Sequence, residues 1–190
     1  LNVNGMSHSS RRSPFANSAV VVTVSPEDYL LNNESDPLPT AGIDFQDRLE
    51  KACFEAGGGG YIAPAQKILD FLSRKTGDLP RTTSFRPGLK SADLSAILPN
   101  KLYAPLRNAL QQFGKRIPGF DSEEALAIGL ETTTSSPLRI LRHTQNLESP
   151  SIEGLFPCGE GAGFAGGIVS SAIDGIRIAD VVAARMGKSK

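Results

Sequence analysis

Residues 154–180 read GLFPCGEGAGFAGGIVSSAIDGIRIAD, and this stretch decides the predicted fold. Residues 155–158 form a short apolar run typical of a buried strand, and residues 159–167 are rich in glycine. From residue 168 onward, apolar side chains recur at helical spacing. The predicted order is therefore strand, glycine-rich turn, helix. Such a turn lets the backbone approach a ligand closely, and the helix start offers unpaired N–H groups to a phosphate or another electron-rich group of a nucleotide.

The spacing of Gly161, Gly163 and Gly166 matches G-x-G-x-x-G, the fingerprint that opens a Rossmann unit. That unit needs a second strand ending in an acidic residue about 20 positions further on. Asp180 lies near that distance but inside the predicted helix, and the sequence ends at Lys190. We therefore interpret the turn as the closing part of a fold. A tight turn whose small residues serve only packing is the alternative.

Charge and composition exclude several classes of protein. Lys plus Arg and Asp plus Glu number 20 each, so no excess charge favours nucleic acid or an anionic membrane. His8 and His143 lie at no metal-ligand spacing, so we predict no metal site. The sequence contains only two cysteines and no signal peptide, and none of its apolar runs approaches the roughly 20 residues of a membrane span. These features favour an intracellular, cytoplasmic protein. A first residue of Leu1 rather than Met indicates a segment of a longer protein or a processed product.

The N-terminal part is predicted to contribute to the same sheet as residues 155–158. Residues 1–18 are polar and loop-like, whereas residues 19–24, AVVVTV, have the unbroken apolar character of a strand buried on both faces. We expect these two strands to be neighbours. Residues 25–41 carry Asn and Pro without periodicity and are interpreted as a linker.

Residues 42–129 are predicted to form a mainly helical insert. The expected helices are residues 44–56 with Asp44 as N-cap, residues 64–76 with Pro64 in the first turn, residues 98–113, and residues 121–128 with Asp121 and Glu124 as a capping box.

Three further features could contact a ligand. Residues 81–90 form a basic, irregular loop that is either solvated or faces an anion, and residues 132–136 supply neighbouring hydroxyl groups in a strand or turn. Glu160 lies inside the glycine turn, where a carboxylate is badly placed for core packing and well placed to accept hydrogen bonds from sugar hydroxyls. We interpret Cys158 as a packed strand residue.

The turn and its helix resemble the C-terminal end of flavoproteins with the glutathione-reductase-like FAD-binding fold. Further motifs along the chain extend this resemblance: Asn4-Gly5-Met6-Ser7, Ala63-Pro64-Ala65-Gln66, Phe85-Arg86-Pro87-Gly88 and Ser135-Ser136-Pro137 with Arg139. With them, residues 3–184 resemble the uncharacterised NAD(P)/FAD-dependent dehydrogenases of bacteria and plastids. The plastid stroma is therefore a second expected location.

The resemblance implies an α/β fold: the closing half of an FAD-binding Rossmann-like domain, interrupted by a mainly helical α+β insert. Residues 1–30 and 130–190 would belong to the FAD-binding domain, and residues 42–129 to a substrate-side domain. The cofactor-binding residues implied are Gly159, Glu160, Gly161, Gly163, Ala165, Gly166, Gly167 and Ile168. The ligand-side residues implied are Arg86, Ser135, Ser136 and Arg139.

The function implied is that of an FAD-dependent oxidoreductase, or dehydrogenase, that transfers a hydride to or from bound flavin, with a small-molecule substrate and NAD(P)H as a candidate electron donor. The helix start after the turn would stabilise negative charge on the reduced flavin. The family's N-terminal G-x-G-x-x-G for the ADP half of FAD has no counterpart here, and Thr133 stands where related sequences tend to have Arg. We therefore expect weak FAD binding by these 190 residues, and association with the missing N-terminal half or with a second copy. The alternative is a noncatalytic nucleotide-binding or structural module.

Overall fold

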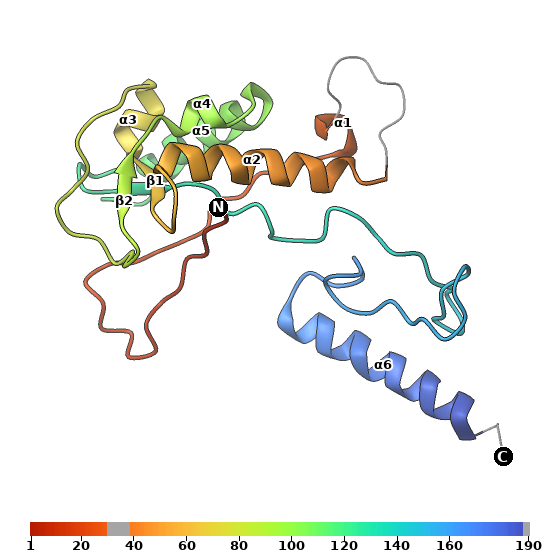
Figure 1. Cartoon of the computed structure of the whole chain (residues 1–190). Coiled ribbons are helices and arrows are strands. Elements are labelled where there is room, and N and C mark those ends of the chain that lie inside the picture. Colours follow the sequence, from red (N-terminus) through yellow and green to blue (C-terminus); the bar gives the residue numbers. More distant parts are fainter. Residues whose placement is uncertain (30–38, 188–190) are drawn as a thin grey trace. The chain divides into compact units, whose positions relative to one another are not determined.

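The computed structural model describes residues 1–29 and 39–187. Helices and strands follow in the order α1 (Pro26–Tyr29), α2 (Ala41–Gly57), β1 (Ala63–Lys67), α3 (Ile68–Ser73), β2 (Leu89–Ser91), α4 (Leu94–Ile97), α5 (Asn100–Arg116), β3 (Leu126–Ile128) and α6 (Ile168–Gly187) (Figure 1). The described residues divide into two compact units: unit 1 contains residues 1–29 and 44–132, and unit 2 contains residues 39–43 and 133–187. The assignment of these regions to FAD-binding and substrate-side domains stays a prediction.

Unit 1 contains a small mixed sheet with the strand order β2-β1-β3, which makes the chain a mixed α/β protein. The central strand β1 runs parallel to β2 and antiparallel to β3. Proline is rare in central strands because it lacks an N–H group. The part of β1 that pairs with β3 begins at Ala65, so Pro64 lies just outside it. On that side of the strand Pro64 contributes only its carbonyl, which accepts the Gly129 N–H at 2.8 Å, and the missing N–H group is therefore tolerated.

The core of unit 1 lies between this sheet and its helices. Its buried side chains come from α2, α3, α4, the residue directly after α4, and α5: Phe45, Ile68, Phe71, Leu94, Leu98, Leu102, Tyr103 and Leu110. The buried Gln66 connects two of these elements, because its amide donates to the Lys75 carbonyl at 2.5 Å and its oxygen accepts from the Leu94 N–H at 3.0 Å. A buried amide satisfied on both sides fixes the end of α3 relative to the start of α4.

Three of the predicted insert helices form, with shifted boundaries. α2 ends at Gly57, as the glycine run predicts, but it begins at Ala41, so Asp44 lies in its first turn instead of capping it. Residues 64–67 belong to β1, and the second helix begins only at Ile68. α5 starts after Pro99 and accommodates Pro105 within it.

The predicted helix at residues 121–128 is wrong. Residues 126–128 instead form β3, whose Ala127 is paired with Gln66 of β1. The Ala125 carbonyl also accepts the N–H of Ile68 at 2.9 Å. Pairing with the otherwise open side of β1 therefore outweighs the local capping signal of Asp121 and Glu124.

The prediction that residues 19–24 and 155–158 form neighbouring strands is also wrong. Neither forms a strand, and the sheet of unit 1 contains neither of them. Val20, Val22 and Val24 pack against the unit 1 core, whereas Val21 is 66% exposed. This alternation means that one face of the segment is covered, not two. α1 begins inside the predicted linker, and residues 30–38 of that linker lie outside the described residues.

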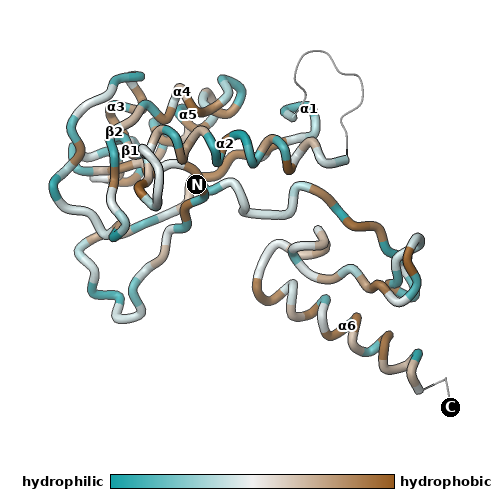
Figure 2. Tube along the Cα trace, viewed as in Figure 1, coloured by the Kyte–Doolittle hydropathy of each residue, from teal (hydrophilic) through white to brown (hydrophobic). Residues whose placement is uncertain are grey.

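Unit 2 contains α6, which starts at Ile168 as predicted. Apolar residues recur along it (Figure 2). Several of them are exposed, including Val169, Ile173 and Ile176. Among the described residues, no helix is both long and apolar enough to cross a membrane.

Candidate functional site

The glycine-rich segment of unit 2 is a compact turn closed by its own backbone. The Gly163 N–H donates to the Glu160 carbonyl at 2.9 Å, and the Phe164 N–H donates to the Gly159 carbonyl at 3.0 Å. Gly159 and Gly163 have φ angles of 69° and 78°, in the left-handed region that favours glycine. These two glycines are therefore required by the turn itself.

Gly163 is also required by packing. A Cβ at this position would lie 3.0 Å from the Arg139 Cα and overlap the Leu138 carbonyl oxygen. The turn is held against residues 138–140 by two hydrogen bonds, from the Ile140 N–H to the Ala162 carbonyl at 3.1 Å and from Arg139 Nε to the Gly163 carbonyl at 2.9 Å. Close contact of two backbone segments leaves no room for a side chain here.

A buried ion pair anchors this turn to α6. The Arg142 guanidinium donates to both carboxylate oxygens of Asp174, at 2.9 and 2.6 Å. Asp174 is only 5% exposed, and one of its oxygens also accepts the Gly159 N–H at 2.9 Å. A bidentate arginine–carboxylate pair with a third, backbone donor is among the strongest polar arrangements in proteins.

Arg142 connects further parts of unit 2. One of its nitrogens donates to the Pro157 carbonyl at 2.7 Å, and its guanidinium carbon lies 3.6 Å from the centre of the Phe164 ring. Arg142 and Asp174 therefore position both ends of the glycine turn. The sequence analysis missed both residues, although a single carboxylate among the apolar residues at the start of α6 was a usable signal.

This environment shifts two pKa values. Hydrogen bonds from Arg142, followed by the Gly159 N–H, lower the pKa of Asp174 from its usual 3.8 to about 2, against the opposing effect of burial. Desolvation and the neighbouring Asp174 carboxylate raise the pKa of the Cys158 thiol. The prediction of Cys158 as a packed strand residue is wrong, because this cysteine is exposed and lies outside the described strands.

The remaining glycines of the turn differ from Gly159 and Gly163. Gly161 and Gly166 have no left-handed φ, and a Cβ on either would meet no atom within 4 Å. Gly167 is nearly as open, since its added Cβ would only reach Ser170 Oγ at 3.8 Å. Neither backbone conformation nor packing within the described residues accounts for glycine at Gly161 and Gly166.

The carboxylate of Glu160 is exposed, and among the described residues it forms no hydrogen bond or ion pair. Ile168, the first residue of α6, is 91% exposed, so the N-terminal end of this helix is open to solvent. Ala165 lies half-buried just before it. The side-chain oxygen of Ser171, in the first turn of α6, is buried without a hydrogen-bond partner among the described residues.

The predicted ligand-side residues fall into two places. Ser136 and Arg139 lie against the turn: Ser136 Oγ donates to the Gly161 carbonyl at 3.4 Å, and Arg139 Nε donates to the Gly163 carbonyl at 2.9 Å. Ser135 is exposed beside them in the sequence. Arg86 belongs to unit 1, where it lines a pocket of about 340 Å³ together with His8 and Arg12. Within the part of the chain that the structure describes, no group of three or more His, Cys, Asp or Glu residues could hold a metal ion.

A family model described as "FAD-dependent protein, C-terminal domain-like" matches residues 1–134. The chain belongs to this family. An uncharacterized protein from Clostridium beijerinckii is 44% identical to it over 181 residues, which cover 93% of this chain and 32% of that relative. The chain thus spans about a third of the length of this relative.

Through this family, the chain is related to flavoproteins. The matched residues include all of unit 1 that the structure describes, whereas the glycine turn and α6 lie beyond residue 134. The similarity to the Clostridium protein extends over almost the whole chain. The family therefore associates this chain with FAD.

Proposed function

We propose that the chain is part of an FAD-dependent oxidoreductase and that the turn at residues 159–168 contacts the flavin side of FAD. The observation that carries this proposal is the pair of open glycines, Gly161 and Gly166. Glycine without a conformational or packing requirement leaves the backbone accessible to a ligand. The turn around these glycines is rigidly held by Arg142 and Asp174, as a pre-organised binding site requires.

The polar groups available at this turn fit FAD. The exposed Glu160 carboxylate can accept hydrogen bonds from the ribityl hydroxyls. The Ser171 N–H already donates to the Gly167 carbonyl at 2.9 Å. The N–H groups of residues 168–170 precede any intrahelical acceptor and lie at the positive end of the helix dipole, which favours an electron-rich ring edge. Ser171 Oγ adds a buried hydroxyl near the base of the turn without a partner among the described residues.

FAD, when bound, would supply the acceptance and donation of a hydride. The chain's own contribution would be orientation and charge stabilisation by Glu160 and by the start of α6. We further propose that the substrate is a small molecule and that NAD(P)H is a candidate electron donor. The surrounding fold would be the closing part of an FAD-binding Rossmann-like domain.

Glu160→Ala is expected to weaken FAD binding about 5- to 150-fold, the effect of losing a charge-assisted hydrogen bond. The free energy of unfolding without FAD should change little, because the carboxylate is exposed and forms no contact with another described residue. Affinity would be measured by titrating FAD into the chain and following the amide resonances of residues 159–168 by NMR, which also detects weak binding.

Glu55→Ala is the matched control, since Glu55 is an exposed carboxylate on α2. It should bind FAD like the wild type. Equal affinities for Glu160→Ala and Glu55→Ala, or resonance changes confined to other residues, would mean that FAD does not contact the turn.

We also infer that the exposed apolar face of α6 packs against a part of the longer family proteins outside the present sequence. Ile176 is 63% exposed, and Val169 and Ile173 lie on the same side of the helix at spacings of seven and three residues. An apolar stripe of this kind on a helix normally faces a core.

This inference predicts faster hydrogen exchange in α6 of the 190-residue chain than in the matching helix of the whole Clostridium protein. An Ile176→Glu variant of the chain should fold as the wild type and lose binding of a hydrophobic dye. Equal exchange rates in the two proteins would show that nothing covers this face.

A further inference from the structure

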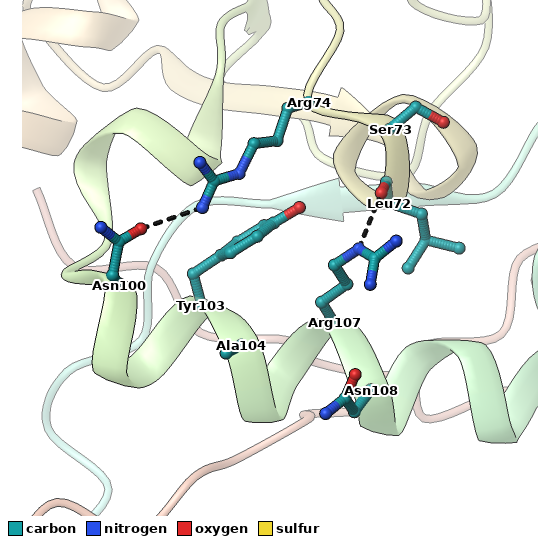
Figure 3. Close-up of a pocket in the computed structure, with 8 residues that line it drawn as sticks. All are labelled: Leu72, Ser73, Arg74, Asn100, Tyr103, Ala104, Arg107 and Asn108. Atoms are coloured by element: carbon teal, nitrogen blue, oxygen red, sulfur yellow. Dashed lines mark hydrogen bonds between the residues drawn. The ribbon is translucent and has the colours of Figure 1, made fainter.

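A second pocket lies in unit 1, between the end of α3 and the first turns of α5 (Figure 3). Its volume is about 520 Å³, and its lining includes two arginines, Arg74 and Arg107, and two asparagines, Asn100 and Asn108. Neither the glycine turn nor the family match assigns a role to it. We propose that this pocket binds the phosphate group of a small molecule.

The two guanidinium groups bring two positive charges to one pocket. Figure 3 shows the Tyr103 ring between them. The Arg74 guanidinium carbon lies 4.3 Å from the centre of that ring, and Arg107 follows Tyr103 by one helical turn. Neither arginine forms an ion pair with a carboxylate within residues 1–29 and 39–187, and the pocket lining contains no acidic residue.

Contacts within the protein hold both arginines but use few of their donors. Arg74 Nη2 donates to Asn100 Oδ1 at 2.9 Å, and Arg107 Nε donates to the Leu72 carbonyl at 2.9 Å. A guanidinium has five N–H donors, so both side chains are oriented and still have donors for a ligand. Capping of the C-terminal end of α3 explains why Arg107 contacts the Leu72 carbonyl. It does not explain why two arginines without a carboxylate partner among the described residues line the same pocket.

The backbone supports the same geometry. Arg74 has a φ of 52°, an uncommon conformation for a residue other than glycine, and its N–H is bonded to carbonyls at the end of α3. The Asp70 and Phe71 carbonyls near the end of α3 are therefore engaged, and Asn100, the first residue of α5, lies in the pocket lining.

The charge of the pocket selects phosphate. A phosphate monoester carries a charge of about −1.5 to −2 near neutral pH, which matches two guanidinium groups. Guanidinium groups bind phosphate oxygens with paired N–H donors, and the exposed Asn108 amide adds a further donor. A neutral or cationic ligand would gain no attraction from the two positive charges.

Titration of the whole chain with inorganic phosphate at constant ionic strength tests this proposal, with NMR resonances of the Arg107 and Asn108 side chains as readout. Asn108→Asp adds a negative charge to the pocket and removes no hydrogen bond that the structure contains within its described residues, so the variant should fold. Phosphate affinity should fall about tenfold or more. Arg107→Gln should show a loss of similar size.

Lys115→Gln is the matched control, because it changes the net charge by the same amount on the same helix, outside the pocket lining. Its phosphate affinity should stay within about twofold of the wild type. A second titration with ADP separates two sources of phosphate: tighter binding than inorganic phosphate indicates a nucleotide, and equal binding indicates phosphate itself. Identical weak responses of the wild type, Asn108→Asp and Lys115→Gln would overturn the proposal.

Discussion

Asp174→Ala is expected to destabilise unit 2 by about 3 to 5 kcal/mol, because it leaves the buried guanidinium of Arg142 without its carboxylate. The Gly159 N–H loses its acceptor in the same variant. Hydrogen exchange of the Gly159, Gly163 and Phe164 amides measures this effect locally. Asp180→Ala, an exposed carboxylate on the same helix, is the control and should exchange as the wild type does. Equal exchange in the two variants would contradict an anchoring role for the ion pair.

Acid should reproduce part of this loss in the wild type. The pKa of Asp174 in the folded protein, about 2, lies below its ordinary value of 3.8, so ionised Asp174 stabilises the folded state above about pH 4. The stabilisation, on the order of 2 kcal/mol, is lost as the pH falls from about 4 to about 2. Asp174→Ala lacks this group, so its stability should change less than that of the wild type in the same pH window.

Gly163→Val is expected to cost about 3 kcal/mol or more, since a β-branched residue must adopt a positive φ and its Cβ overlaps the Leu138 carbonyl. Gly166→Val is the matched variant within the same turn. It should leave the stability within about 0.5 kcal/mol of the wild type, because the position is open and its φ lies outside the left-handed region. Thermal unfolding and hydrogen exchange of unit 2 compare the two variants.

The same pair of variants separates folding from binding. Gly166→Val should stay folded but lose FAD binding, because its side chain would occupy the space in which the proposed ligand approaches the turn. A folded Gly166→Val variant that binds FAD as the wild type does would show that the open glycine has no ligand-binding role. Equal stability of the two valine variants would instead contradict the packing argument for Gly163.

Local signals in the sequence predicted the helices well and the strands poorly. The apolar spacing in α2, α5 and α6 is a property of each segment, so those helices could be found without a structure. A strand needs a partner, and partners are chosen by tertiary structure. Residues 126–128 pair with β1 despite a helix-capping signal just before them, whereas residues 19–24 have strong strand character and remain outside the sheet.

The candidate site shows the same division. The glycine spacing at residues 159–167 and the helix that follows are visible in the sequence, and so is the exposed position of Glu160 in the turn. The family resemblance implied Ser136 and Arg139 only as ligand-side residues, and their hydrogen bonds to the Gly161 and Gly163 carbonyls of the turn became visible only in the structure.

The sequence by itself therefore determined the order of turn and helix, the apolar faces of the long helices and the neutral overall charge, because these depend on residues close together in the chain or on composition. Only the tertiary structure decided which glycines are required and which are open, and that Arg142 and Asp174 hold the turn. The physical reason is that a buried ion pair forms between residues 32 positions apart, and no local pattern specifies which distant charge will be its partner.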